Sequence, residues 1–288
     1  VTTYLTVSAI FFYMGLIPDL AAVRDASTGR RRRIYGLLAL GWQNRWEQWR
    51  HYARAYMCLA ALATPLVISV HSVVSWDFAM SVLPGWHTTI FAPYFVAGAI
   101  HSGLAMVIVL LIPGRRLLRL ELIIQRRHFE AMAQVMIFTG LIIFYAYAVE
   151  AFMAWYSGNE FERSFAAWRA FGPNAWAFWG MVTCNAVLPL AFFFKRVRAS
   201  IPALFVIAIL VNVGMWLERF VIIVNSTAHD FLPYAWGSYS LSPVEIVISV
   251  GALAWFLSLF LLFAKFLPAV AISEVKEHDV AERLEAAG

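Results

Sequence analysis

The stretch HSVVSWDFAMSVLPGWH, residues 71–87, places three titratable side chains between two long apolar runs. His71, Asp77 and His87 can accept protons, and the stretch contains no Lys or Arg. Histidine and carboxylate groups are common proton acceptors in general-base chemistry. Such a set of acceptors suits a substrate that releases protons when it reacts, so these three residues are the catalytic candidates. The alternative for Asp77 is a loop acid or a helix cap.

The same region supplies aromatic side chains for an apolar pocket. Trp76 and Trp86 lie within the stretch, and Tyr94 follows in the next apolar run. Small-molecule sites are mostly apolar clefts in which a few polar groups orient the ligand. A small amphiphile that enters from lipid and carries exchangeable protons fits this description. Trp76, Trp86 and Tyr94 are therefore the candidate quinol-binding residues.

Membrane helices must position these residues. Of 288 residues, 62% are hydrophobic and 14% are charged, whereas soluble domains carry about 25% charged residues. A spanning helix needs about 20 mostly apolar residues, and runs of that length exclude a β-barrel, whose strands alternate. The sequence thus predicts an all-α integral membrane protein with seven spans, at 2–18, 53–73, 88–112, 130–156, 176–194, 201–224 and 243–266.

The loops between these spans differ in basic residues. Lys and Arg number seven, five and three in the loops 19–52, 113–129 and 195–200, and none occur in the loops 74–87 and 225–242. Because basic loops stay in the cytoplasm, the alternation predicts an N-terminus outside and a C-terminus in the cytoplasm. The stretch that opens with His71 would then lie at the outer face.

Away from the ends of the predicted spans lie four His, Glu or Arg residues, at depths where a charge costs at least about 2.5–3.5 kcal/mol. At about 1.5 Å rise per residue, Glu150, Glu218 and Arg219 lie in the outer third of the bilayer and His101 near its middle. All four are candidates for a proton path. The alternative is structural: Arg219 ties to Glu150, and His101 only hydrogen-bonds a neighbouring helix. Glu218 and Arg219 point about 100° apart, so we do not expect them to pair with each other.

The histidines and cysteines do not fit a metal or haem centre. A b-type haem needs two histidines at one depth, and His71 and His101 differ by roughly 15 Å. No HxxxH or ExxH pair occurs on a predicted helix. Cys58 and Cys184 form no CxxC pair, which argues against an iron–sulfur site. We expect no metal and no covalent cofactor, with quinol or quinone, menaquinone or ubiquinone, as the substrate.

Three peripheral features complete the predicted organisation. Trp42, Trp46 and Trp49 fall at positions i, i+4 and i+7 of one helical face, which predicts an interfacial helix. The polar residues 273–288 predict a cytoplasmic tail that follows a membrane domain ending at residue 272. The chain opens at Val1 in apolar sequence, with no Met and no basic flank, so we expect upstream helices to be missing.

Three stretches carry a resemblance to a known family. They are ATPLVISVHSVVSWDFAMSVLPGWHTTIFAPYFVAGAIHSG (63–103), FFYMGLIPDLAAVRD (11–25) and GMWLERFVIIV (214–224). They resemble the NrfD/polysulfide reductase family of membrane subunits, and within it the quinol-oxidising ActC-type subunits of bacterial alternative complex III. The resemblance implies two four-helix bundles, of which this N-terminally truncated chain would hold one bundle and part of the other.

The resemblance also implies a function. Subunits of this kind carry no redox centre, bind quinol near the outer face and pass electrons to a partner iron–sulfur protein. The implied partners are membrane lipid and the other subunits of a respiratory complex, multihaem cytochromes among them, and no nucleic acid. Proton translocation is a further expectation. In the family, His and Asp residues on the bundle lost here also belong to the site, so this chain would hold only part of it.

Two other functions compete with this one. A polytopic transporter would use Glu150, Glu218 and Arg219 as a polar path, but transporters often show paired, broken helices. Pro65 and Pro189 lie inside predicted spans without forming such a repeated pair. A cytochrome b-like haem protein is disfavoured by the different depths of the histidines.

Overall fold

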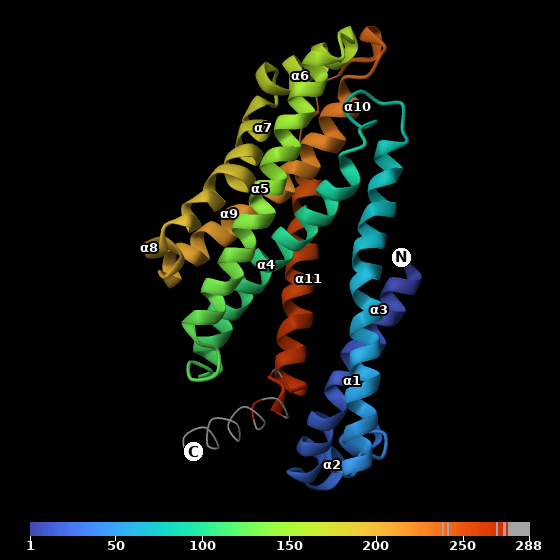
Figure 1. The fold of residues 1–288 in the computed structure, drawn as a ribbon, viewed down its shortest axis with the longest axis vertical. Coiled ribbons are helices and arrows are strands. Elements are labelled where there is room, and N and C mark those ends of the chain that lie inside the picture. Colours follow the sequence, from blue (N-terminus) through green and yellow to red (C-terminus); the bar gives the residue numbers. More distant parts are fainter. Residues whose placement is uncertain (238, 241, 269, 273–274, 276–288) are drawn as a thin grey trace. The chain divides into compact units, whose positions relative to one another are not determined.

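The computed structural model describes residues 1–237, 239–240, 242–268, 270–272 and 275. Regular structure within these residues is helical, as the ribbon in Figure 1 shows. The predicted tail, 273–288, lies outside the described residues apart from Val275, so that prediction stays a prediction.

Seven helical segments of the described chain are long and apolar enough to cross a membrane. They are α1 (Thr2–Asp25), α3 (Trp46–Ala79), α4 (Phe91–Leu117), α5 (Arg126–Tyr156), α7–η2 (Ala175–Phe193), α9–α10 (Ile201–Ala228) and α11 (Pro243–Phe266). The shorter helices between them include α2 (Gly29–Leu38), α6 (Glu160–Phe171), α8 (Lys195–Arg198) and η4 (Pro233–Ala235). The predicted all-α, multi-pass membrane fold is confirmed.

Local sequence determines where two of the helices begin. At α11, the Ser242 side chain accepts a hydrogen bond from the Glu245 backbone at 3.3 Å, and the Glu245 carboxylate accepts one from the Ser242 backbone at 2.7 Å. This capping box is followed by Pro243 at the first helical position, where a missing N–H costs nothing. At α6, Asn159 accepts hydrogen bonds from two backbone N–H groups of the first turn.

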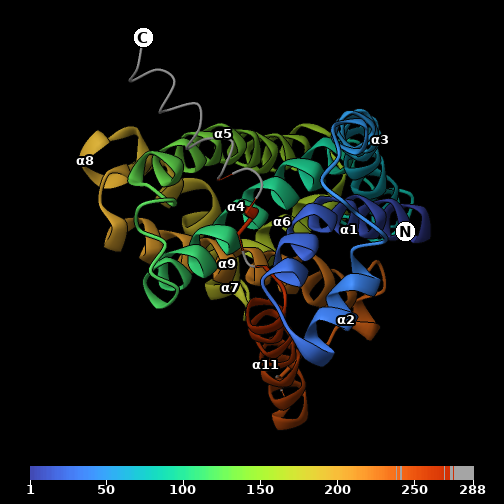
Figure 2. The same ribbon diagram turned by 90° about the horizontal axis from the view of Figure 1, so that it is seen from below.

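The chain divides into two compact units, residues 1–67 with 240–288 and residues 68–239. The second unit contains a four-helix bundle, in which α4 packs on α5 and α9, α7 packs on α9, and η2 (Leu188–Phe193) packs on α5. Figures 1 and 2 show α4, α5 and α9 running side by side. This bundle is the one that the family resemblance predicted.

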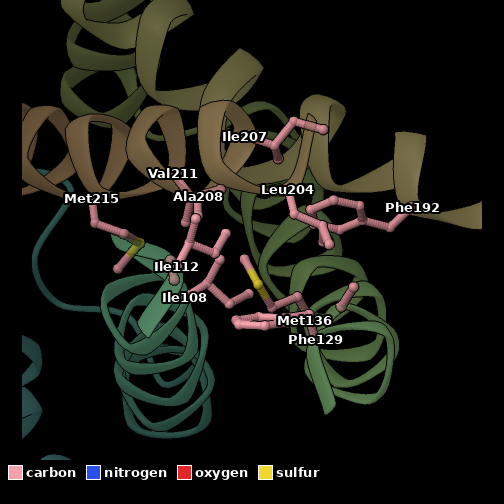
Figure 3. Packing of buried hydrophobic residues seen from close by; sticks show 12 residues of the cluster. Ile108, Ile112, Phe129, Met136, Phe192, Leu204, Ile207, Ala208, Val211 and Met215 are labelled. Carbon is pink, nitrogen blue, oxygen red and sulfur yellow. The ribbon is translucent and has the colours of Figure 1, made fainter. Parts of the chain in front are cut away.

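Apolar packing fills one part of the bundle. Figure 3 shows side chains of α4, α5, η2 and α9 converging there, among them Ile108, Met136 and Leu204. Between membrane-spanning helices such side chains stabilise the bundle through close van der Waals contact, because lipid tails are as apolar as the side chains themselves. The buried members of this Ile108 cluster are Ala105, Ile108, Ile112, Phe129, Ala133, Met136, Phe192, Leu204, Ile207, Ala208, Val211 and Met215.

A second apolar cluster lies further along the same helices. It is aromatic at its α4 side, and Phe78 and Trp86 pack against it. The buried members of this Phe91 cluster are Phe91, Tyr94, Phe95, Ala97, Ile143, Ala146 and Ile222.

Two predictions about the ends of α3 are wrong. The helix runs from Trp46 to Ala79 and contains the predicted span 53–73, but residues 74–79, assigned to a loop, are helical, Trp76 and Asp77 among them. Trp42 does not share a helical face with Trp46, because the residues before α3 turn sharply, with φ of 75° at Gly41 and 59° at Asn44. Trp42 is instead buried in the unit formed by residues 1–67 and 240–288.

Candidate functional site

A layer of buried polar side chains separates the Ile108 and Phe91 clusters. On α4, His101 lies between the residues of the two clusters, and Thr139 holds the same place on α5. Glu218 does so on α9, and Asn185 faces it from the π-helical turn η1 (Thr183–Val187). All four side chains are at most 3% exposed. Buried polar groups at this depth are expensive and mark functional positions.

Glu218 is the centre of this layer. The Tyr147 hydroxyl donates a hydrogen bond to Glu218 Oε2 at 2.6 Å, and Asn185 Nδ2 donates to the same oxygen at 3.4 Å. Asn185 Nδ2 also lies 3.2 Å from the Tyr147 oxygen. The Tyr94 ring meets Tyr147 edge-on, with 5.8 Å between the ring centres. Glu218 Oε1 forms no hydrogen bond within the described residues, and its charged neighbour is Arg219, with Nη2 at 3.4 Å.

The observed ion pairs differ from the predicted ones. Arg219 Nη2 lies 3.4 Å from Glu218 Oε1, because the long Arg side chain turns back toward its neighbour. Its guanidinium also stands 4.4 Å from the Phe95 ring centre, a cation–π contact. Glu150 pairs instead with Arg169 of α6, at 2.6 Å. The predicted tie between Glu150 and Arg219 is therefore wrong, as is the expectation that Glu218 and Arg219 do not pair.

Glycine allows α9 to approach the π-helical turn η1. A Cβ at Gly214 would lie 2.3 Å from Asn185 Oδ1 and 2.5 Å from Cys184 Cβ, closer than packed atoms come. A second π-helical turn, η3 (Val221–Asn225), follows Glu218 on α9. Such turns are rare and frequent at functional sites. The close approach at Gly214 and the two turns set the position of Asn185 against Glu218.

His101 adjoins this cluster. Its Nδ1 lies 2.8 Å from Thr139 Oγ1, which is the expected hydrogen bond to a neighbouring helix. Its Nε2 is buried without a hydrogen-bond partner in the described part of the chain. A Cβ at Gly140 would lie 3.5 Å from His101 Cε1 and 3.7 Å from the Asn185 carbonyl, so His101 and Asn185 flank the same glycine. A proton-path role for His101 stays a prediction.

The three predicted catalytic residues are not brought into mutual contact. Because α3 continues through Ala79, His71 and Asp77 point about 120° apart on one helix. His71 is half-buried, whereas Asp77 is exposed and forms no hydrogen bond or ion pair with another described residue. Asp77 lies in the last turn of α3, where the helix dipole disfavours an acid. It is therefore neither a loop acid nor an N-cap.

His87 lies in the loop after α3 and contacts α6. Its Nε2 is 3.2 Å from Glu162 Oε1, and its Nδ1 is 3.1 Å from the Leu83 carbonyl. Glu162 also accepts a hydrogen bond from the Gly85 backbone at 3.2 Å. Gly85 has φ of 76°, and a Cβ there would lie 2.3 Å from the Phe165 ring of α6. Only glycine fits this turn, which holds the loop of residues 80–90 on α6.

Two of the three predicted aromatic residues, Trp86 and Tyr94, belong to or pack against the Phe91 cluster, which borders the polar layer. Trp86 Nε1 donates a hydrogen bond to the Ile222 carbonyl of η3 at 2.6 Å. Tyr94 is 4% exposed within the Phe91 cluster. Trp76 is 51% exposed on α3. The structure thus places Tyr94 beside Tyr147, the partner of Glu218, places Trp86 on η3, and leaves Trp76 with Asp77 on the α3 surface.

A further histidine, His229, is enclosed beside α6. Its ring stacks on Trp236 at 3.9 Å between centres and lies 5.0 Å from Trp168. Burial lowers the pKa of His229 below its ordinary value of 6.5, although Asp230 opposes the shift. This histidine is neutral at pH 7 and serves the packing of residues 229–237 onto α6.

Sequence reasoning missed several residues of the site. Asn185 is a polar residue inside the predicted span 176–194, and that signal could have found it. Asn159 followed by Glu162 is the capping pattern of a helix start, which would have revealed α6 and its Arg169. Tyr147 gives no signal, because a tyrosine in a span is usually an ordinary aromatic. Within the described residues no group of three or more His, Cys, Asp or Glu could hold a metal ion.

The family model described as polysulphide reductase, NrfD, matches residues 2–229. The chain belongs to the NrfD family. The matched region includes the whole polar layer and all spans except α11. Membership of the NrfD family implies a membrane subunit of a quinol or polysulphide reductase-type complex, and NrfD proteins partner iron–sulfur subunits in respiratory complexes. No curated protein matches this sequence significantly.

Proposed function

We propose that this NrfD-family chain is the quinol-oxidising membrane subunit of a respiratory complex and passes electrons to an iron–sulfur partner. The observation that carries the proposal is Glu218, a fully buried carboxylate with one oxygen free of hydrogen-bond donors among the described residues. Aromatic and polar side chains surround it, as a pocket for an amphiphile with exchangeable protons requires.

The proposed chemistry follows from the two carboxylate oxygens. Oxidation of a quinol to a quinone releases two protons and two electrons, and the electrons leave for the iron–sulfur partner. Tyr147 and Asn185 hydrogen-bond Oε2 of Glu218, so Oε1 is the atom that accepts a proton. Arg219 lies beside Oε1 and compensates the carboxylate charge while the site is empty. The Phe95 ring holds the Arg219 guanidinium in place.

The residues nearer the loop of residues 80–90 keep a proposed role in the same reaction. His71, Asp77 and His87 are proposed as acceptors for protons that leave the site, and Trp76 as part of the quinol approach along α3. His87 already faces a second acceptor, Glu162, at 3.2 Å. This end of the bundle is proposed to face the outside of a bacterial cytoplasmic membrane, since its loops carry few basic residues.

Proton movement past Glu218 is proposed to reach His101 and to stop there. His101 borders the same glycine as Asn185, and its Nε2 is available for a proton. Beyond it lies the Ile108 cluster, twelve buried residues without a titratable group. His101 is thus proposed as the innermost residue of a proton path. The assignment to an ActC-type subunit of alternative complex III, with multihaem cytochrome partners, rests on the family resemblance.

One observation favours a second candidate, a transporter. Both α7–η2 and α9–α10 are interrupted by π-helical turns close to Glu218, and broken helices often surround transported substrates. The sequence had indicated no such pair. A transporter would move a solute without oxidising quinol, so the activity of the assembled complex separates the two functions.

The test is the quinol:acceptor activity of the assembled complex carrying Glu218→Gln. The amide keeps the shape and the hydrogen bond from Tyr147 but cannot accept a proton. General-base contributions are about 10²–10⁴-fold, so we expect a loss of kcat of that size with normal assembly. Glu160→Gln, on the exposed first turn of α6, is the control and should keep its activity. Near-normal turnover of Glu218→Gln would refute the proposal.

A further inference from the structure

An open groove of about 610 Å³ lies between α2 and the end of α11, both within the unit formed by residues 1–67 and 240–288. Arg31, Ile34, Tyr35 and Leu38 line it from α2, and residues 265–267 line it from the end of α11. The Tyr35 hydroxyl donates a hydrogen bond to the Phe266 carbonyl, which ties the two walls together. The groove is separate in sequence from every residue of the proposed quinol site.

The groove combines two cations with an apolar floor. Arg31 stands 5.5 Å from the Tyr35 ring centre, and Lys265 Nζ stands 5.4 Å from that of Phe266. Neither Arg31 nor Lys265 pairs with a carboxylate among the described residues. Ile34, Leu38 and Phe266 supply the apolar surface. A ligand that fits must carry a negative group at one end and hydrocarbon at the other.

The groove lies where a spanning helix ends. The apolar run of α11 stops at Phe266, and Lys265 is in its last turn. A spanning helix ends at the level of the lipid headgroups. On α2, Ile34 is 59% and Leu37 is 78% exposed next to four consecutive arginines, residues 30–33. Exposed apolar residues beside arginines are typical of a helix that lies on a membrane surface.

We propose that this groove binds one anionic phospholipid. Its phosphate lies between Arg31 and Lys265, and one acyl chain runs over Ile34, Leu38 and Phe266. Arginine pairs with phosphate oxygens through its planar donor fork, and basic pockets between membrane helices are known to bind anionic headgroups. The bound lipid fastens α2 to the end of α11. This site is independent of quinol oxidation and does not rest on the proposed function.

The chain itself offers a rival occupant. Residues 273–288 carry five acids, Glu274, Glu277, Asp279, Glu282 and Glu285. The apolar floor of the groove favours lipid, because a segment with so many charges has few side chains to cover Ile34, Leu38 and Phe266. The level of the groove at the end of a spanning helix favours lipid as well.

The test measures lipid binding to the assembled complex by native mass spectrometry, with phosphatidylglycerol as the anionic probe and phosphatidylcholine as the zwitterionic comparison of zero net charge. We expect wild type to retain phosphatidylglycerol preferentially. The double variant Arg31→Gln/Lys265→Gln should weaken its binding about thirty-fold, the effect of two lost headgroup contacts. The control, Arg30→Gln/Arg33→Gln, also removes two positive charges, but from residues of α2 that do not line the groove. It should weaken binding less than about three-fold.

A second variant keeps the charges and fills the floor. Ile34→Trp should also reduce phosphatidylglycerol binding, which diffuse attraction to a basic surface would not produce. Equal losses in the two double variants would overturn the proposal, as would unchanged binding in Arg31→Gln/Lys265→Gln. Preference for phosphatidylglycerol that appears only after residues 273–288 are removed would assign the groove to the tail and also overturn it.

Discussion

Gly214→Ala tests whether the contact between α9 and η1 is as close as the structure shows. The new Cβ would lie 2.3 Å from Asn185 Oδ1 and 2.5 Å from Cys184 Cβ. The second atom belongs to the stem of a side chain on a neighbouring helical segment, so it cannot turn away. Inserting a methyl group into packed structure costs about 1–3 kcal/mol, and two contacts this short place the cost near the upper value.

The same change brings a smaller gain. Alanine is favoured over glycine inside a helix by about 1 kcal/mol, so the net destabilisation of Gly214→Ala is about 2 kcal/mol. For a large domain, 1 kcal/mol shifts Tm by about 2–4 °C, and the expected fall is therefore roughly 4–8 °C. Asn185 is displaced by the same methyl group, so quinol oxidation should fall more than Tm alone explains.

Gly103→Ala on α4 is the matched control. A Cβ at Gly103 meets no atom within 4 Å, so only the favourable helix propensity remains and Tm should stay equal or rise. Thermal unfolding of both variants in the same detergent gives the comparison. A Gly214→Ala protein as stable as Gly103→Ala would refute the close approach and, with it, the placement of Asn185 against Glu218.

Two further predictions follow from α6 and its neighbours. Since the pKa of His229 is lowered in the fold, the unfolded chain binds the proton more readily than the folded chain does. The free energy of unfolding therefore does not depend on His229 above pH 6.5, where its ring is neutral in both states, and decreases as the pH falls below 6.5. The Tm of wild type should therefore drop between pH 7.5 and 5.5 by more than the Tm of His229→Phe, and an equal drop in both would contradict the enclosure of a neutral ring. Arg169→Met leaves the Glu150 carboxylate without its 2.6 Å partner and should cost about 3 kcal/mol. Adding Glu150→Gln should recover most of that loss in chemical unfolding, and no recovery would show that Arg169 acts through packing on Phe165 and Phe178 instead.

The seven spans could be predicted because their signal is composition over a long window. The end of α3 could not be placed as well, since the predicted span stopped at residue 73 and Asp77 was assigned to the loop 74–87. The helix continues to Ala79, and Pro84 and Gly85, of which Gly85 has positive φ, lie in the loop that follows. Those two residues were a better signal than the charge, because a helix tolerates an exposed acid but not a proline followed by a glycine of positive φ.

The site was harder to predict than the fold. Glu218 and Arg219 were found from the cost of charge in a membrane. Their partners were missed, because side-chain torsions decide whether a long Arg turns back toward its neighbour. The place of Asn185 depends on a π-helical turn and on the glycine at 214 that faces it, and neither feature has a reliable sequence pattern. Aromatic residues such as Tyr147 acquire a role only from what the fold places beside them.

The central claim is that Glu218 takes a proton from quinol, and infrared difference spectroscopy tests it directly. Adding quinol to the oxidised complex should produce the carbonyl band of a protonated carboxylic acid, shifted in heavy water. The band should be absent from Glu218→Gln and present in Glu160→Gln. A band of unchanged size in Glu218→Gln, or none in wild type during turnover, would contradict the claim.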